Sequence, residues 1–328
     1  MLKTCASIML AAAVLGSTVP ALAQDRVVFQ ANWLIQGENA YMFAGRARGF
    51  YREENIDLVI NRGFGSGDTV NKVVAGQATV GTADIGAIML GRVRQNIPVR
   101  CISAEYAYSP HSFWVLESSG IRSIADLVGK RVGITPGNSH LVYFPLVARA
   151  NNVDPARVAF TNMEAGALLP TLLAGRIDAM PGFATVYELR NRQARQAGQA
   201  LRMMTFADNG LRIYGECQFV AESAIAGNRD LLQRYMRATI RSFRWANENP
   251  EETARLHAAA NPELPEADIL VNHRAFMQYV FNETSARVGV GGFDMDQLRR
   301  TYEAVAAAQN LTAPFDPAAL VDTQFLPQ

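Results

Sequence analysis

Residues 56–85 have the sequence IDLVINRGFGSGDTVNKVVAGQATVGTADI. The segment begins as an apolar extended run, passes through a glycine-rich turn at residues 63–68, and continues as a helical run that ends at Ala75-Gly76. A second extended run then closes on Ala83-Asp84. Two extended apolar runs separated by a helical run predict a βαβ unit.

A weaker copy of this unit follows later in the chain. Gly67 recurs as Gly166 and Gly76 recurs as Gly175, so both pairs are 99 residues apart. Apolar positions align as well, because Val73 and Val74 correspond to Leu172 and Leu173. A chance match between common residues is the alternative interpretation. The repeat predicts an α/β protein with two similar lobes.

Length and composition are those of an ordinary globular protein. The chain has 328 residues, of which 49% are hydrophobic, so it can bury a substantial core in about two domains. Its 31 basic and 30 acidic residues give a net charge of +1. No cluster of lysine and arginine in the sequence resembles a nucleic-acid or anionic-membrane footprint, so we expect neither partner.

The first residues are typical of a secretory signal peptide. Lys3 supplies the positive end, Ile8 to Gly16 is a short apolar run, and Ala21-Leu22-Ala23 matches an A-x-A cleavage site. A membrane anchor would need about 20 apolar residues, and Pro20 interrupts the run too early. We therefore expect residues 1–23 to be cleaved and the remaining chain to be exported to the periplasm.

Two cysteines remain after this cleavage, Cys101 and Cys217. An oxidising compartment would permit one disulfide between them. Each lies in an apolar extended run, where a buried free thiol is the simpler interpretation. Both alternatives stay open.

The order of predicted elements divides the chain into three segments. Strands and helices alternate until about residue 215, after which the pattern becomes a series of helices. We expect residues 24–110 to form the first part of lobe 1, residues 111–214 to form lobe 2, and residues 215–328 to return to lobe 1 as a helical tail. The chain would then cross between the lobes twice.

The expected site is a cleft between the strand-to-helix loops of the two lobes, because ligands of open α/β sheets lie beyond the carboxyl ends of the strands. In these loops, glycines and small hydroxyl residues at helix starts leave backbone N–H groups free, and aromatic side chains recur beside them. The candidate ligand-binding residues are Trp33, Asn39, Tyr41, Phe64, Gly65, Ser66, Asp84, Glu105, Tyr108, Pro136, Asn138, Ser139, Tyr143, Glu164, Phe183, Tyr187 and Glu216.

The side chains in these loops favour a particular ligand class. Carboxylates outnumber cations there, with only Arg62 and Arg212 nearby. Such a cleft suits a flat, neutral or cationic organic molecule, which would stack on aromatic faces and form hydrogen bonds at its edge. The alternative is that individual aromatic residues pack the loops and individual glutamates cap helices or form ion pairs.

Catalytic and cofactor motifs are largely absent from the sequence. The glycine turn lacks the last glycine of a dinucleotide fingerprint, because Asp68 stands there. Residues 137–141, GNSHL, differ from a nucleophile elbow because Leu141 replaces the final glycine. The four histidines lack zinc spacing, and a solvated or capping role is expected even for His111, which lies in a predicted crossover. We expect no enzyme activity, no cofactor and no metal.

Residues 47–57, ARGFYREENID, resemble one protein family together with the loop at Trp33 and residues 65–67 and 75–77. The family is that of periplasmic substrate-binding proteins of ABC importers in the nitrate, sulfonate and taurine group, in the SsuA/THI5-like branch. The resemblance implies a two-lobed type II periplasmic-binding-protein fold with two Rossmann-like lobes joined by two crossover strands. It also implies a monomer that closes on its ligand and delivers it to ABC permease and ATPase subunits.

The same resemblance implies that the Trp33 loop, residues 65–67 and residues 136–139 supply the pocket. Residues 34–39 lack the proline and the nearby histidine of the pyrimidine binders. The first hypothesis is therefore a small, aromatic or heterocyclic, pyrimidine-like solute. Alternatives are a sulfonate, taurine or nitrate-type anion, a sensor partner, and a pyrimidine-synthesising enzyme, which would need a cofactor lysine where only Lys72 and Lys130 remain.

Overall fold

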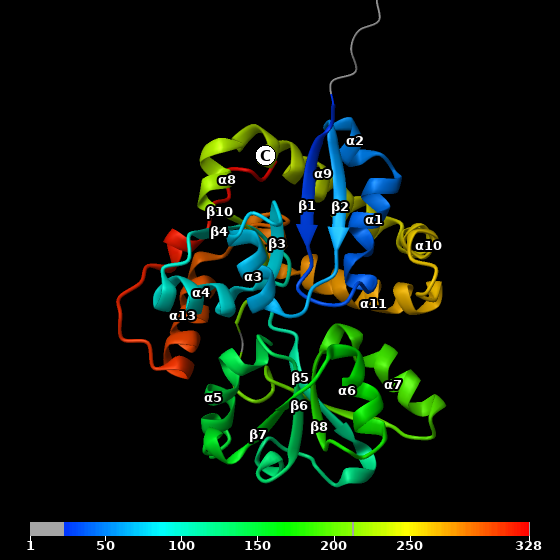
Figure 1. Cartoon of the computed structure of the whole chain (residues 1–328), viewed down its shortest axis with the longest axis vertical. Coiled ribbons are helices and arrows are strands. Elements are labelled where there is room, and N and C mark those ends of the chain that lie inside the picture. The colour runs from blue at the N-terminus through cyan, green and yellow to red at the C-terminus, as the bar shows by residue number, and fades with distance from the viewer. Residues whose placement is uncertain (1–22, 212, 328) are drawn as a thin grey trace, which may run out of the picture.

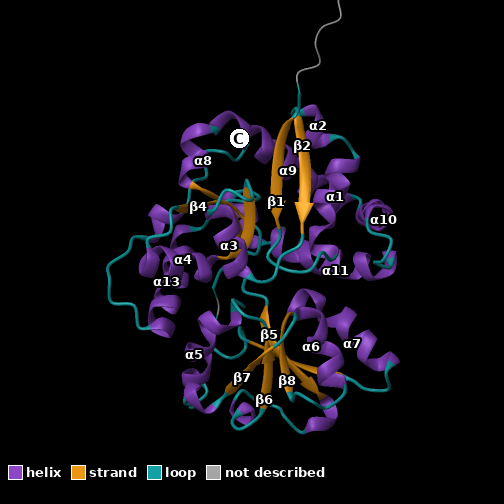
Figure 2. Ribbon diagram, viewed as in Figure 1, coloured by secondary structure: helices purple, strands orange, loops and turns teal. Residues whose placement is uncertain are grey.

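The computed structural model describes residues 23–211 and 213–327, which form two α/β lobes placed end to end (Figure 1). Helices surround a five-stranded mixed sheet in each lobe (Figure 2). The predicted signal peptide falls almost wholly on residues 1–22, outside the described residues. Among the described residues, no helix combines the length and the apolar character needed to cross a membrane.

The first lobe contains the sheet with strand order β2-β1-β3-β10-β4. Strands β1 (Asp25–Gln30), β2 (Ile56–Asn61) and β3 (Val80–Asp84) are parallel, whereas β10 (Glu216–Ala221) runs antiparallel to both β3 and β4 (Val99–Ala104). The helices that connect these strands are α1 (Ala40–Ala47), α2 (Phe50–Glu53), α3 (Ser66–Val74) and α4 (Ile85–Gln95). Strands β1 and β2 point toward the second lobe, so their carboxyl ends lie at the boundary between lobes (Figure 1).

The second lobe repeats this arrangement with strand order β7-β6-β8-β5-β9. Strands β6 (Arg131–Ile134), β7 (Ala159–Asn162) and β8 (Ala179–Phe183) are parallel, and the crossover strand β5 (His111–Leu116) lies antiparallel between β8 and β9 (Leu201–Thr205). Its helices are α5 (His140–Ala150), α6 (Ala165–Leu173) and α7 (Tyr187–Gln196). In each sheet the strand that enters from the other lobe, β10 or β5, takes the fourth place in the order and is antiparallel to its neighbours.

The repeat predicted from the sequence is confirmed at the level of single residues. Helices α3 and α6 are both nine residues long, and their starts and ends are each 99 residues apart. Each is followed by a glycine in the left-handed region, Gly76 at φ +70° and Gly175 at φ +65°. A left-handed glycine ends a helix without steric cost, which explains why the Ala-Gly pair recurs.

The helical tail contains α8 (Glu222–Gly227), α9 (Arg229–Glu248), α10 (Pro250–Ala260), α11 (Glu266–Val280), α12 (Glu283–Val288) and α13 (Met295–Gln309). Helices α9 and α10 pack on α1, which agrees with a return to the first lobe. Helix α13, in contrast, packs on both α4 and α5. Gln309 donates to the carbonyl of Val142 at 2.6 Å, and Arg149 donates to that of Ala307 at 2.7 Å, so the tail also holds the second lobe.

The interpretation of the two cysteines as buried free thiols is wrong. Cys101 and Cys217 form a disulfide, with their Cα atoms 5.9 Å apart. The pairing follows from topology, because the chain returns to the first lobe as β10 and lies next to β4. Local sequence could not show this neighbourhood across a separation of 116 residues.

Candidate functional site

A cavity of about 250 Å³ lies between the two lobes. The first lobe contributes the loop after β1, the short helical turn at Gly37–Asn39 and the start of α3. The second lobe contributes the starts of α5 and α6, the end of β8 and one face of α7. The carboxyl ends of the parallel strands therefore supply most of the lining, as the sequence predicted for an α/β cleft.

Flat and apolar side chains form the larger part of the cavity wall. Trp33 comes from the first lobe, and Trp114, Leu168 and Phe183 come from the second. The indole of Trp114 donates to Ser112 Oγ at 2.8 Å, which fixes its orientation. These surfaces suit the faces of a planar ligand ring.

The glycine-rich loop at residues 63–67 meets the loop at residues 135–139 at the edge of this cavity. Gly67 donates its N–H to the carbonyl of Gly137 at 3.3 Å, across the boundary between lobes. Gly65 has φ +127°, and a Cβ atom added there would lie 3.1 Å from the carbonyl oxygen of Gly137. The backbone conformation at Gly65 favours glycine, and the close approach to Gly137 leaves little room for a side chain.

A polar group at the start of α5 faces the cavity. Asn138 accepts a hydrogen bond from the backbone N–H of His140 at 3.0 Å and donates to Thr135 Oγ1 at 3.1 Å. The ring of His140 lies between Asn138 and the carbonyl of Ser112, with Nε2 3.0 Å from that oxygen. Burial lowers the pKa of His140 to about 4, so this ring is neutral near pH 7.

A carboxylate and a guanidinium reach the cavity from opposite lobes. Glu38 accepts a hydrogen bond from Tyr106 at 3.1 Å, and burial raises the pKa of Glu38 to about 7. Arg190, on α7, donates to Gln193 at 2.9 Å and to Gln36 at 3.4 Å. Near neutral pH, Glu38 can therefore donate or accept a hydrogen bond at a ligand edge.

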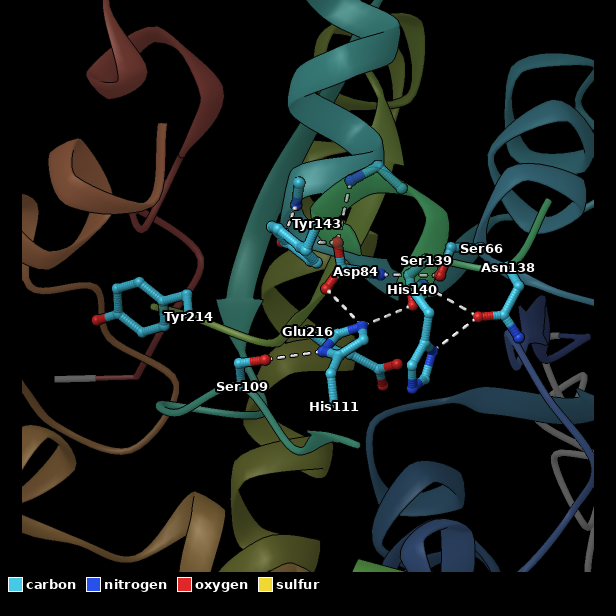
Figure 3. Close-up of polar contacts among 12 residues, drawn as sticks. Ser66, Asp84, Ser109, His111, Asn138, Ser139, His140, Tyr143, Tyr214 and Glu216 are labelled. Atoms are coloured by element: carbon cyan, nitrogen blue, oxygen red, sulfur yellow. Dashed lines mark hydrogen bonds and ion pairs between the residues drawn. The ribbon is translucent and has the colours of Figure 1, made fainter. Parts of the chain in front are cut away.

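Beside the cavity, a cluster of buried polar side chains joins the two lobes (Figure 3). Tyr143 donates to Asp84 at 2.8 Å and accepts from the N–H of Gly86 at 3.0 Å. His111 lies 2.8 Å from Ser139 Oγ through Nε2 and 2.8 Å from Ser109 Oγ through Nδ1. Burial raises the pKa of Asp84 to about 8 and holds the pKa of His111 well below its usual range. The expectation that His111 is solvated or capping is therefore wrong.

Six of the residues proposed from sequence line the cavity: Trp33, Gly65, Ser66, Asn138, Ser139 and Phe183. Asp84 and Tyr143 lie beside it in the polar cluster, and Glu216 accepts a hydrogen bond from the lining residue Asn32. Pro136 and Glu164 do not line the cavity, although each lies within two residues of a residue that does.

The remaining proposed residues lie elsewhere in the structure. Tyr41 donates to Glu105 at 2.6 Å inside the first lobe, and Asn39 accepts a hydrogen bond from the backbone of Gln36. Tyr187 donates to the carbonyl of Leu201 at 2.6 Å, away from the cavity. Phe64 and Tyr108 are 45% and 42% exposed, because their loops turn these side chains toward solvent.

Several lining residues were missed by reasoning from sequence. Trp114 lies on a crossover strand, and its contact with the cavity depends on the strand order of the second sheet. Arg190 follows Tyr187 by three residues, so it lies on the neighbouring face of the same helix turn, a signal that helical periodicity could have supplied. His140 directly follows Ser139, but the sequence was used only to test it for zinc spacing and for a nucleophile elbow, both of which it lacks.

The cavity lining combines aromatic and apolar surfaces with a few polar side chains. Within the described residues, no three histidine, cysteine, aspartate or glutamate side chains are grouped to hold a metal ion. In the same part of the chain, no lysine lines the cavity. What the geometry offers is stacking surfaces with hydrogen-bonding groups at the edge.

A family model and curated relatives match most of the chain. Residues 36–253 match the family described as NMT1/THI5 like. The chain is 25% identical over 302 residues to the riboflavin-binding protein RibY of Chloroflexus aurantiacus, covering 87% of this chain and 81% of that one. It is 27% identical over 246 residues to a 4-amino-5-hydroxymethyl-2-methylpyrimidine phosphate synthase of Legionella pneumophila, covering 74% and 75%.

Solved structures share the architecture at lower sequence identity. The alkanesulfonate-binding protein SsuA from Xanthomonas axonopodis pv. citri, bound to MOPS, matches with a TM-score of 0.67 and 14% identity. The match covers 91% of this chain and 98% of that one. The two-lobed periplasmic-binding-protein fold predicted from the sequence is confirmed.

Proposed function

The chain belongs to the NMT1/THI5-like family, and from this premise we propose that it is a solute-binding protein of an ABC importer. It captures a small aromatic or heterocyclic molecule between its lobes. The observation that carries the proposal is the interlobe cavity, whose walls are flat and apolar and whose polar groups are few and come from both lobes. A ligand in this position contacts both lobes at once, so it binds the closed arrangement better than an open one.

The size and lining of the cavity support a planar and compact ligand. Its volume of about 250 Å³ is slightly below the usual range for ligand pockets, roughly 300–1,000 Å³. Trp33, Trp114 and Phe183 offer stacking surfaces, while Glu38 and Asn138 offer hydrogen bonds to ring edges. Relatives named for riboflavin and for a pyrimidine phosphate support a heterocyclic ligand.

An inorganic or sulfonate anion is a weaker candidate. In the described part of the chain, Arg190 is the only lysine or arginine that lines the cavity. Glu38 also lines it, and His140 is neutral near pH 7 because of its lowered pKa. A neutral ring that accepts a hydrogen bond from Arg190 fits these charges better than a free anion does.

Pyrimidine synthesis is the other alternative, since one relative is named as a synthase. Lys72 forms an ion pair with Asp68 at 2.8 Å on the outer face of α3, and Lys130 is exposed in a loop of the second lobe. Neither lysine reaches the cavity. The site is therefore equipped to hold a heterocycle rather than to build one.

The wider role that we propose follows the family. Residues 24–110 with 215–328 form one closing lobe and residues 111–214 form the other. The protein acts as a monomer in the periplasm after removal of residues 1–23, and it delivers its ligand to permease and ATPase subunits. The strand order of the two sheets and the A-x-A sequence at Ala21-Leu22-Ala23 support this assignment.

A ligand screen tests the proposal directly. Thermal shift measurements with flavins, pyrimidines, other heterocycles and sulfonates should give an upward shift for heterocycles. The shift should be lost in Trp33→Ala and Phe183→Ala but kept in Phe64→Ala, a matched aromatic residue that points to solvent. No shift with any compound, or a shift that survives both cavity substitutions, would refute the proposed function.

A further inference from the structure

The closed boundary between the lobes contains a buried acid and a buried base side by side. Asp84 Oδ2 lies 3.6 Å from His111 Nε2, and both side chains are fully buried. Among the described residues, this oxygen of Asp84 has no hydrogen-bond partner, whereas Oδ1 accepts from Tyr143 and from the N–H of Ala87. An ionised carboxylate in this position would leave one oxygen buried without compensation, which is energetically costly.

The surroundings of the pair come from every element packed against it. Ser66 on α3 accepts from the N–H of Asp84. Tyr143 lies on α5, Ser139 is the residue just before that helix, and Ser109 precedes β5. Among titratable groups, Glu216 interacts electrostatically with Asp84 and also with Glu38 and Glu105, and the ring of His140 lies against that of His111. His111, Tyr143 and Ser139 belong to the second lobe and Asp84 to the first, so separation of the lobes parts Asp84 from His111 and Tyr143 and admits water.

We propose that Asp84 and His111 hold one proton between them when the lobes are closed, so that closure near neutral pH takes up a proton from solvent. This inference rests on the proposed function, because it describes regulation of the same site. The proton can lie on Asp84 Oδ2 or on His111 Nε2, and in either place the pair has zero net charge. Closure therefore buries a neutral pair rather than an isolated carboxylate.

The direction of the pH dependence follows from counting protons in each state. In an open, hydrated arrangement above about pH 6.5 the carboxylate is ionised and the imidazole is neutral, so the pair holds no proton. The closed pair keeps its proton up to about pH 8, where the raised pKa of Asp84 lies. Between these values, the ratio of closed to open molecules should increase as the pH falls, by less than the limiting tenfold for each pH unit because both limits lie close together.

Below about pH 6.5 the open state also holds one proton, on the imidazole, so the contribution of this pair levels off. Glu38 has a closed-state pKa of about 7 and adds its own proton uptake below that value. This contribution is shared by the unsubstituted protein and by the variants below. Differences between proteins therefore isolate the pair.

The test uses the ligand-free protein, with small-angle X-ray scattering or interlobe fluorescence transfer from pH 5.5 to 8.5. In the unsubstituted protein, the pair should increase the ratio of closed to open molecules about fourfold between pH 8 and pH 7, because half of the closed pairs still lack the proton at pH 8. In Asp84→Asn this step should disappear, because the amide is neutral at every pH and can donate to His111. In His111→Gln the step should remain, and the dependence below pH 6.5 should become steeper, because no imidazole binds a proton in the open state.

Asp230→Asn is the matched control, since Asp230 is an exposed carboxylate that pairs with Arg234 far from the cavity. It should leave the pH profile unchanged, and far-ultraviolet circular dichroism should show that all variants are folded. A profile that is flat in the unsubstituted protein, or unchanged in Asp84→Asn, would overturn the inference. Since no ligand is used, this result is separate from the ligand screen, which alone can refute the proposed function.

Discussion

Gly182→Ala is the substitution that tests the wall of the cavity most precisely. Gly182 lies on β8, and a Cβ atom placed there would be 2.3 Å from Cε2 and Cζ2 of the Trp114 indole. No pair of non-bonded carbon atoms tolerates that distance, so the indole must move. The indole is held by its hydrogen bond to Ser112 and by packing against Tyr187, and both Trp114 and Gly182 line the cavity, so the change alters the cavity wall.

Two effects should follow from this displacement. Overpacking of a buried position typically lowers the free energy of unfolding by about 1–3 kcal/mol. The displaced ring should also reduce the ligand-induced thermal shift, because it occupies part of a cavity of about 250 Å³. Urea unfolding measures the first effect and the thermal shift of the best compound measures the second.

Two matched variants make this prediction refutable. Gly227→Ala, at the end of α8, has no atom within 4 Å of the added Cβ and should be neutral or stabilising in a helical position. Gly182→Ala combined with Trp114→Phe should recover part of the lost stability, because the smaller ring relieves the clash. If Gly182→Ala were as stable and as active in binding as Gly227→Ala, the placement of Trp114 against β8 would be wrong.

Three further predictions concern stability. Reduction of the Cys101–Cys217 disulfide, or Cys217→Ala, should lower the free energy of unfolding by about 2–5 kcal/mol, since the disulfide closes a loop of 116 residues. Urea unfolding with and without reductant measures this loss, and equal stability under both conditions would contradict the prediction. Burial lowers the pKa of His257 to about 3. The stability that the buried neutral ring contributes is therefore complete above about pH 6.5 and decreases toward pH 3 by up to about 1.4 kcal/mol per pH unit. In His257→Phe the melting temperature should depend less on pH over this range, and an unchanged dependence would contradict the lowered pKa. Tyr143→Phe should lower the free energy of unfolding by about 1–3 kcal/mol, because the Gly86 N–H and the Asp84 carboxyl group each lose a buried hydrogen-bond partner. Equal denaturation midpoints for the two proteins would argue against the interlobe contact.

The two-lobed fold could be predicted from the sequence because the same local pattern occurs twice in it. The Ala-Gly pairs that end α3 and α6 have a physical cause in the left-handed glycine, and their constant spacing identifies two equivalent lobes. The loops at Trp33 and Asn138 were predicted to line the site because strand-to-helix connections of parallel strands lie at one edge of a sheet. Local patterns were sufficient for these features.

The residues that were misplaced depend on information that local patterns lack. Tyr41 and Glu105 lie near the right strand ends but bond to each other inside the first lobe, because helix rotation decides which side chain reaches a cleft. Trp114 and the Cys101–Cys217 pair depend on antiparallel crossover strands, whose neighbours are distant in sequence. Strand order is a property of the whole sheet, and no single segment contains it.

The central claim is that the space between the lobes holds a small heterocycle. Native mass spectrometry of the protein purified under mild conditions tests this most directly, with absorbance spectroscopy of whatever the protein releases on denaturation. We expect a bound molecule with aromatic absorbance that is absent from the Trp33→Ala and Phe183→Ala double variant and present in Phe64→Ala. Retention of the same molecule by the double variant, or a bound molecule without a ring, would contradict the claim.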